Sequence, residues 1–410
     1  MSKKLLIVGF VWPEPKSSAA GSRMLQLIEQ FLNQNFEITF ACAAKTSDNT
    51  YDLSQIGVNT QTIFLNDATF DDFVSKLHPD IVLFDRFMVE EQYGWRVAEH
   101  CPKALRVLDT EDFHGLRKAR EQALKAGVEV TIEHLQNDTT KREIASIYRC
   151  DLSLIISEAE VDILTQQFKI DESLLYYLPF LLEPTEEEKI SGLPSFEERQ
   201  HFITIGNFLH PPNYDAVLYL KQVIWPLIRK QLPKAELHIY GAYKSQKVIQ
   251  LHKEKDGFVI KGFADDVNDV MKQSRVCLAP LRFGAGLKGK LVDAMQNGTP
   301  CVMSGIAAEG MFGELDLNGF IENNPESFAQ KAVELYIKAE VWKDKQNNGF
   351  KVLNLRFDKA NFKDEFAQKI EGLSKDLKKH RQSNFIGHIL QHQTLQSTKY
   401  LSKWIAEKNR

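Results

Sequence analysis

The 410-residue sequence lacks the features that would assign it at once to a disulfide-stabilised, metal-binding or membrane-spanning class. Cysteine is scarce and shows no C-x-x-C spacing; the five residues are Cys42, Cys101, Cys150, Cys277 and Cys301. An odd number of scattered cysteines, most of them in apolar runs, predicts buried free thiols in a reducing compartment. No apolar run has the length of a membrane span, and the run near the amino terminus is too short for a signal peptide. We therefore expect a cytoplasmic protein.

Neither sign of charge is in excess. The chain has 51 Lys and Arg against 55 Asp and Glu, a net charge of −4, so composition provides no basic face for a nucleic-acid partner. The dinucleotide fingerprint G-x-G-x-x-G is also missing after the first predicted strand. The irregular loop 12–22 that stands there is far longer than that motif allows, which argues against tightly bound NAD. This loop, with Gly21 and Ser22 at its end, could instead contact a substrate.

Strand-like and helical stretches alternate along two parts of the chain, which predicts an α/β protein with parallel sheets covered by helices on both faces. Residues 1–184 form the first series. The polar stretch 185–200 is typical of a linker, and residues 201–350 hold the second series. The predicted strands are Lys4–Phe10, Glu37–Cys42, Gln61–Leu65, Ile81–Phe84, Leu105–Leu108, Leu152–Ile156, Leu175–Leu178, His201–Ile205, Glu236–Tyr240, Phe258–Ile260, Val276–Ala279 and Pro300–Met303.

Residues 351–410 are predicted to be mostly helical, with part of this segment packing back on the N-terminal domain. From Asp376 onward the segment is basic and carries large apolar side chains, among them Phe385, Leu401 and Trp404. Packing on the protein is the simplest interpretation. Binding of a partner and weak association with the inner face of a membrane are the alternatives.

The stretch Leu281–Met303 follows a buried strand and reads as a glycine-rich loop, a helix and another strand. The first amide groups of a helix have no internal partner and carry partial positive charge, so they favour an anion. Gly284 and Gly286 would let a phosphate approach the backbone, and Lys288 and Lys290 would neutralise it. The alternative is a tight turn with two solvated lysines, because such loops also occur by chance.

In the first series, Asp109–Gly115 directly follows a predicted strand, and ligands of open α/β sheets bind at the carboxyl ends of strands. His114 could act there as an acid, a base or a hydrogen-bond donor. The alternative is a purely structural role, in which the acids mark a helix start and Asp112 is its N-cap. For Glu111 we favour this structural role. The acidic pairs 71–72 and 265–266 stand in helix-start contexts, so we expect caps there and no obligatory metal.

The second series resembles the donor-binding domain of the retaining family-four (group 1) glycosyltransferases, which have the two-domain GT-B architecture. Leu291-Val-Asp293-Ala-Met295-x-x-Gly298-x-Pro300-Cys-Val302 is similar to the family pattern L-L-E-A-M-A-x-G-x-P-V-V, and Ala308-Glu309-Gly310 resembles the A-E-G turn that follows it. Gly206-Asn-Phe-Leu-His-Pro-Pro-Asn213 resembles the opening of the second domain in one branch. The similarity covers most of residues 202–325 and is weaker before them.

The resemblance implies two Rossmann-like doubly wound domains facing across a cleft. It also implies a donor site on the second domain and an acceptor on the first. The family places two acids eight positions apart; here the second is Asp293, expected to hold the ribose hydroxyls, and the first is replaced by Ala285. The predicted catalytic residues are His114, Asp112 and Lys290. The predicted donor-binding residues are Arg282, Gly284, Ala285, Gly286, Lys288, Lys290, Asp293 and Glu309. The predicted acceptor-side residues are Gly21, Ser22 and Asp109.

The resemblance therefore implies a glycosyltransferase that moves a sugar from a nucleotide-diphosphate sugar to a saccharide, a lipid-linked glycan or a protein. Transfer is expected with retention, without a metal or other cofactor, and in cell-surface glycan synthesis. Two alternatives remain at this point. Ala285 is compatible with a degenerate nucleotide-binding protein without turnover, and the same fold could serve a nucleotide-sugar epimerase.

Overall fold

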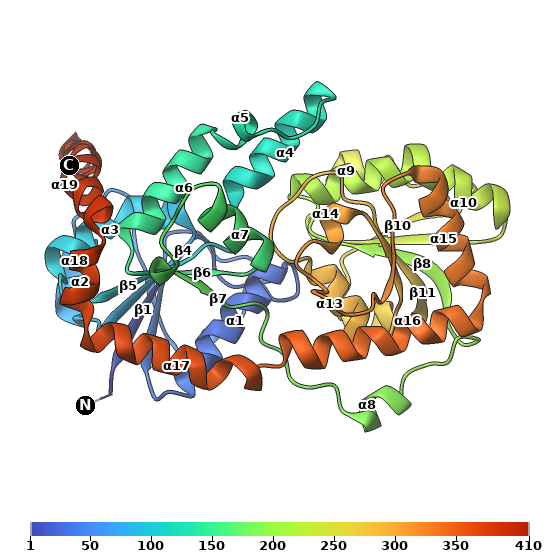
Figure 1. Cartoon of the computed structure of the whole chain (residues 1–410), viewed down its shortest axis with the longest axis horizontal. Helices are drawn as coiled ribbons and strands as arrows, with labels where there is room; N and C mark the ends of the chain where they lie inside the picture. Colours follow the sequence, from blue (N-terminus) through green and yellow to red (C-terminus); the bar gives the residue numbers. More distant parts are fainter. Residues whose placement is uncertain (1, 409–410) are drawn as a thin grey trace.

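The computed structural model describes residues 2–408, apart from the side chains of residues 393–396. The chain forms two α/β domains, each with one parallel sheet between layers of helices (Figure 1). The first sheet has seven strands in the order β3-β2-β1-β4-β5-β6-β7. Its strands are β1 (Lys4–Gly9), β2 (Glu37–Cys42), β3 (Asn59–Thr62), β4 (Ile81–Asp85), β5 (Leu105–Asp109), β6 (Leu152–Ile155) and β7 (Leu175–Tyr177). The predicted α/β class is confirmed.

Both faces of the first sheet are buried because its central strands β1 and β4 hold unbroken apolar runs, at residues 5–8 and 81–84. In β1, Leu6 and Val8 pack on one face and Leu5 and Ile7 on the other, and all four are fully buried. Alternate side chains of a strand point to opposite faces, so a run that is apolar throughout requires a helical layer on each side. These layers are α1 (Ala19–Leu32), α2 (Thr69–Leu77), α3 (Phe87–His100), α4 (His114–Ala126), α5 (Ile132–Leu135), α6 (Asp138–Arg149) and α7 (Glu158–Gln166).

The second sheet has six strands in the order β10-β9-β8-β11-β12-β13. They are β8 (Gln200–Ile205), β9 (Leu237–Tyr240), β10 (Phe258–Gly262), β11 (Ser274–Ala279), β12 (Cys301–Met303) and β13 (Gly319–Ile321). The last of these is a short edge strand that was not predicted. The helices are α9 (Pro211–Tyr219), a π-helical turn (Leu220–Ile224), α10 (Trp225–Gln231), α11 (Gln246–Ile249), α12 (Val267–Gln273), α13 (Gly289–Gln296), α14 (Gly305–Ala308), α15 (Pro325–Ile337) and α16 (Ala339–Val352).

Two connections join the domains. The linker contains a short helix, α8 (Glu187–Ser191), and after α16 the chain returns through a π-helical turn (Leu353–Phe357) to the first domain. There α17 (Ala360–Lys375) packs Phe366 and Ile370 against the core face that holds α1. Next, α18 (Leu377–Ser383) leads into α19 (Phe385–Lys408), which lies against α3 and α6 (Figure 1). The C-terminal segment therefore packs on the N-terminal domain.

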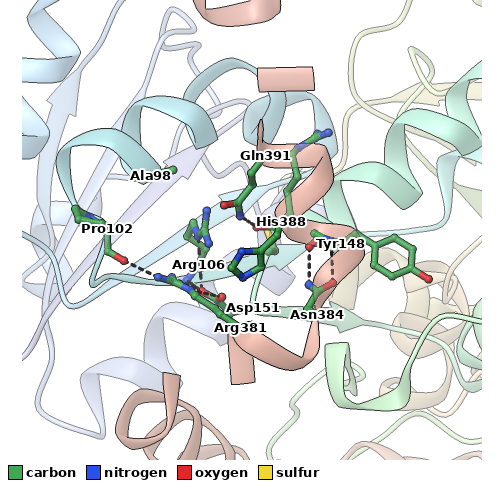
Figure 2. A pocket seen from close by; sticks show the side chains of 12 residues that line it. Ala98, Pro102, Arg106, Tyr148, Asp151, Arg381, Asn384, His388 and Gln391 are labelled. Carbon is green, nitrogen blue, oxygen red and sulfur yellow. Dashed lines mark hydrogen bonds and ion pairs between the residues drawn. The ribbon is translucent and has the colours of Figure 1, made fainter. Parts of the chain in front are cut away.

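Polar contacts fasten this C-terminal segment (Figure 2). Arg381 pairs with the buried Asp151 through two nitrogens and also donates to backbone carbonyls of the first domain. Asn384 donates to the Tyr148 carbonyl at 2.7 Å. The cavity beside them holds about 210 Å³, less than the roughly 300 Å³ at which ligand pockets begin, so it is not a candidate for a nucleotide-sugar. Among the described residues, no helix combines the length and apolarity needed to cross a membrane.

Several helices begin differently from the predictions. Asp112 does not cap α4, because the helix begins at His114 after Phe113 and the Asp112 carboxylate bonds Arg117. The sequence Pro211-Pro-Asn213 before an apolar periodic stretch predicts Asn213 as an N-cap, but Pro211 starts α9 and Asn213 lies inside it. Asp71 does not cap α2 and pairs with Arg96 instead. The cap predicted at 265–266 is confirmed, because Asp266 accepts from the Asn268 amide.

Candidate active site

The glycine loop predicted to bind the donor lies at the carboxyl end of β11, in the centre of the second sheet. Gly284 and Gly286 adopt φ angles of 155° and 65°, in the region that only glycine enters without strain. Lys288 occupies the N-cap position of α13, and Lys290 lies in its first turn. The backbone amides of this turn and both lysines thus gather at one edge of the sheet, as the sequence indicated.

The loop is pressed against the first domain. The Gly286 amide donates to Oε1 of the buried Glu160 at 2.7 Å, and Arg120 donates to the Gly284 carbonyl at 2.8 Å. Arg120 also forms a two-pronged ion pair with Glu309, at 2.6 and 2.8 Å. Ala285 is buried within the apolar cluster of the first domain. The side chain at this position therefore touches the facing domain, and a larger residue would meet that cluster.

Burial changes the protonation of the charged groups in the donor segment. The Lys288 ammonium donates to the carbonyls of Ala285 and Gly286, and burial lowers the pKa of Lys288 to about 8. Lys290 donates to Asn213 Oδ1 at 2.9 Å, and burial lowers its pKa to about 8 as well. Burial raises the pKa of Asp293 to about 7, against the opposing effect of Lys290. Each of these groups is poorly solvated and would be stabilised by a ligand of complementary charge.

The facing part of the first domain is a cluster of acids around His114. Its Nδ1 lies 3.1 Å from Asp112 Oδ1 and 3.4 Å from Oε1 of the buried Glu143. Burial disfavours the imidazolium, but Asp112 and Glu143 outweigh burial and raise the pKa of His114. Glu143 also accepts from the backbone amides of His114 and Gly115. His114 is therefore fixed at the start of α4 in a setting that favours its protonated form.

Two residues that follow adjacent strands of the first sheet have strained backbones. Arg86 and Glu111 follow β4 and β5 with φ angles of 73° and 63°, values that are uncommon outside glycine. Burial, Asp109 and Asp85 raise the pKa of Glu111 to about 8. Strain of this kind persists where surrounding structure imposes it, and it clusters at functional sites. Glu111 therefore lies among the charged side chains of Asp109, Asp85 and Arg86 at the ends of β4 and β5.

Four other predicted residues already bond or pack against groups of the protein, and a ligand would have to replace these contacts. Asp109 is fully buried and bonds Arg23 through both of its oxygens. Ser22 donates to the Pro15 carbonyl, and Gly21 packs on the Glu14 backbone so closely that a Cβ would lie 2.5 Å from the Glu14 carbonyl oxygen. Arg282 pairs with Asp215 at the surface. The binding roles of Gly21, Ser22, Asp109 and Arg282 stay predictions.

Four side chains at the domain contact were not predicted. Arg120 and Glu160 form hydrogen bonds across the contact, and Glu143 accepts from the amides at the start of α4. His210 lies close enough to Asp112 and Arg117 for their charges to act on it. Burial and the neighbouring cations lower the pKa of His210 to about 4, so it is neutral at pH 7. The order Ser157-Glu-Ala-Glu160 is typical of a capping box, but Ser157 makes no side-chain cap hydrogen bond, and the Glu160 carboxylate instead accepts from the amides of Phe113 and Gly286.

The chain resembles known proteins by sequence in its second domain and by fold over most of its length. Residues 199–338 match the family model described as glycosyl transferases group 1. Sucrose-phosphate synthase from Thermosynechococcus elongatus has 12% identity and a TM-score of 0.69 over 90% of this chain and 99% of its own. TarM of S. aureus has 11% identity and a TM-score of 0.67 over 91% and 100% of the two chains. HepE from Anabaena, solved with UDP and glucose, has 14% identity and a TM-score of 0.67 over 90% and 99%. No curated protein matches the chain by sequence.

These matches confirm the predicted fold, two Rossmann-like domains in the GT-B arrangement, and the resemblance to group 1 glycosyltransferases. The matched segment contains the complete glycine loop and α13.

Proposed function

Since residues 199–338 match the group 1 glycosyl transferases and the whole chain has their fold, we propose that the protein is a glycosyltransferase that moves a sugar from a nucleotide-diphosphate sugar, with retention and without a metal, in cell-surface glycan synthesis. The observation that carries the proposal is the glycine loop at the end of β11, which brings Lys288 and Lys290 together beside the first domain, with Lys288 close enough to Asp112 for that charge to act on it. The anomeric course is taken from the resemblance. HepE was solved with UDP and with UDP-glucose, which makes UDP the first nucleotide to test.

The second domain supplies the groups that a departing diphosphate requires. Cleavage of the sugar–phosphate bond leaves negative charge on the diphosphate while the sugar gains positive character. The amides at the start of α13 and the two lysines would stabilise that charge, which removes the need for a cation. Asp293 would accept hydrogen bonds from the ribose hydroxyls, because a carboxylate has two acceptors suited to a diol.

The Glu160 carboxylate occupies the position that we assign to a phosphate oxygen of the donor. Its carboxylate takes the hydrogen bond of the Gly286 amide and lies near Lys288, whose charge acts on it. Burial and Asp112 raise the pKa of Glu160 to about 7. Donor entry would therefore require Glu160 to withdraw, by a small separation of the two domains. Closure around the donor would then exclude water and limit hydrolysis.

His114 and the acids around it face the position of the sugar. A protonated His114 would donate a hydrogen bond to the sugar or to the bridging oxygen, and Asp112 would keep it charged. The acceptor would enter from the first domain.

Ala285 favours one second candidate, a nucleotide-binding protein without turnover. Alanine cannot make the sugar contact that the family assigns to an acid at this position, and here its side chain packs on the facing domain. Binding of a nucleotide-sugar without transfer or hydrolysis would support this candidate.

The binding experiment is calorimetry with UDP, GDP, ADP and their sugar conjugates, first without metal and then with Mg²⁺. We expect Asp293→Ala to weaken binding of the preferred nucleotide about 10- to 100-fold, the effect of losing charge-assisted hydrogen bonds. Asp316→Ala removes an exposed carboxylate from the same domain and serves as the matched control. Unchanged affinity in Asp293→Ala would contradict the ribose assignment, and failure of all three nucleotides to bind would contradict the proposed donor class.

The pH dependence of kcat/KM is expected to be bell-shaped with limbs at about 7 and about 8. Asp293, with a pKa of about 7, must be ionised to accept ribose hydrogen bonds, so the rate falls as pH drops below 7. Lys288 and Lys290, with pKa values of about 8, must be charged to hold the diphosphate, so the rate falls again above 8. Asp293→Asn should flatten the acidic limb and keep the basic one. A profile that is flat from pH 6 to 9 would contradict these roles.

A further inference from the structure

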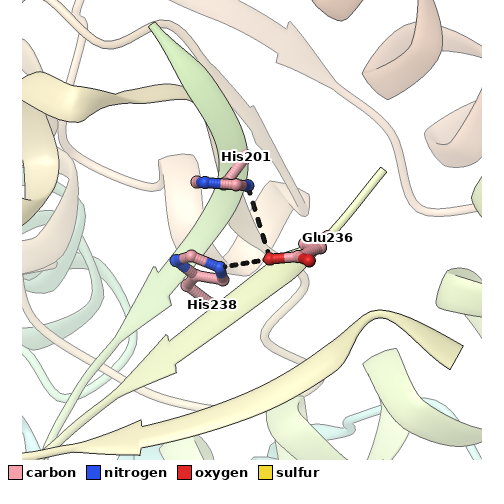
Figure 3. Close-up of side chains that lie close together, drawn as sticks. All are labelled: His201, Glu236 and His238. Atoms are coloured by element: carbon pink, nitrogen blue, oxygen red, sulfur yellow. Dashed lines mark hydrogen bonds and ion pairs between the residues drawn. The ribbon is translucent and has the colours of Figure 1, made fainter. Parts of the chain in front are cut away.

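Two histidines and a glutamate meet at the amino-terminal edge of the second sheet (Figure 3). His201 is the second residue of β8, His238 lies in the adjacent β9, and Glu236 immediately precedes β9. The parallel pairing of β8 with β9 sets Phe202 opposite Leu237 and thereby brings the three side chains to one face. They come from positions up to 37 residues apart, and none of them belongs to the donor segment.

Their ligand atoms are grouped at the spacing of a metal site. His238 Nε2 lies 2.8 Å and His201 Nδ1 lies 3.7 Å from the same oxygen, Glu236 Oε2. All three ligand atoms lie within 4.8 Å of one another. A tetrahedral zinc ion with bonds of about 2.05 Å places its ligands roughly 3.3 Å apart. The distances from Glu236 Oε2 to the two histidine nitrogens, 2.8 and 3.7 Å, lie on either side of that value, so rotation of the three side chains could bring them around one ion.

The chemistry of the set suits a borderline transition metal. Imidazole nitrogen and carboxylate oxygen are ligands of Zn²⁺, and two histidines with one glutamate leave a fourth position for water. The rings stack with centroids 4.0 Å apart, so two charged imidazoliums would repel each other there.

The backbone at His201 supplies an independent observation. Its φ angle is 62°, in the left-handed region that a residue with a Cβ enters at a cost. In this conformation the His201 ring stacks on the His238 ring. Lys261, on β10, places a positive charge in the same patch and opposes a cation, although Glu236 offsets it.

We propose that His201, Glu236 and His238 bind one divalent transition-metal ion, with Zn²⁺ the best match to this ligand set. The strands run from this edge toward the glycine loop at the opposite end of the sheet, so the ion would take no part in sugar transfer. Its role would be to tie β8 to β9 where the chain enters the second domain from the linker. The expectation of a metal-independent transfer reaction is unaffected.

The test is a titration of the purified full-length protein, stripped with a chelator, using Zn²⁺ in competition with a chromophoric indicator. We expect one equivalent to bind with micromolar or higher affinity, and Co²⁺ to give the visible absorption of a four-coordinate site. Glu236→Gln keeps the shape of the side chain and should weaken binding at least 10-fold, and His238→Ala about 100-fold. Lys261→Ala should tighten binding several-fold, because it removes the opposing charge.

His392→Ala is the matched control, since it removes an exposed imidazole from α19. It should bind Zn²⁺ like the wild type. The thermal unfolding midpoint of each variant without metal shows whether the fold is intact. Equal binding by the wild type, Glu236→Gln and His238→Ala would overturn the proposal, as would the absence of a micromolar site in the wild type. Chelation is expected to leave sugar transfer unaffected. Failure of the metal site would therefore not count against the proposed function, which is tested separately by nucleotide binding.

Discussion

Replacing Lys290 by alanine is expected to lower kcat/KM for sugar transfer about 100- to 1000-fold. Loss of one group that stabilises developing negative charge in an enclosed site has an effect of this size. Lys290 meets the conditions for such a group: it lies in the first turn of α13, where the helix amides already favour an anion, and its ammonium is poorly solvated. The effect should fall more on kcat than on nucleotide affinity, because charge on the diphosphate increases as the bond to the sugar breaks.

The fold gains little from this lysine. Burial lowers its pKa, which means that the folded protein holds the ammonium less readily than the unfolded chain does. The penalty is present below pH 8 and disappears as pH rises toward the ordinary value for lysine. At pH 7 Lys290→Ala should therefore keep or raise the unfolding midpoint while activity falls. Lys272→Ala, which removes an exposed lysine paired with Asp269, should change neither quantity. Full activity in Lys290→Ala would remove the lysine from the donor site.

The sequence predicted the fold well because its strands are apolar on both faces. β1 and β4 could be read from their composition, since only a parallel sheet covered on both sides buries such runs. β13 has three residues, one of them the exposed Ile321, and so carries no comparable signal. Boundaries of the helices were less accurate, as at Asp112 and Asn213. Side chains that could cap a helix locally found stronger partners elsewhere in the folded chain.

The sequence predicted only the part of the candidate site that is formed by one continuous segment of the chain. The loop from Gly284 to Lys290 is a continuous motif, whereas its partners in the first domain lie far away in sequence. Glu160 is 126 residues from Gly286, and Arg120 is 189 residues from Glu309. No spacing rule connects such pairs, and both first-domain residues occur in ordinary surface-like helical patterns. His201 and His238 were missed for the same reason, because strand pairing brings them together.

The largest effect on stability is expected from Arg23→Ala, which should lower the free energy of unfolding by about 3–5 kcal/mol. Arg23 and Asp109 are both inaccessible to solvent. The guanidinium donates to both Asp109 oxygens, and it also donates to the carbonyls of Leu178 and Pro179, at 2.7 and 3.1 Å. Alanine would leave a buried carboxylate beside Asp85 and Glu111, together with two carbonyls that lose their donor.

Arg142→Ala is the matched control, because it shows how much the free energy of unfolding changes when a surface arginine is removed. Arg142 pairs with Glu91, but its side chain is 53% exposed, and such surface pairs contribute at most about 1 kcal/mol. Urea unfolding of both variants measures the difference directly. Replacing both buried partners, as in Arg23→Met with Asp109→Leu, should recover part of the loss because no uncompensated charge remains. If Arg23→Ala proved no less stable than Arg142→Ala, Asp109 would not depend on Arg23 for its charge. A ligand-binding role for Asp109 would then become the better explanation of its place at the end of β5.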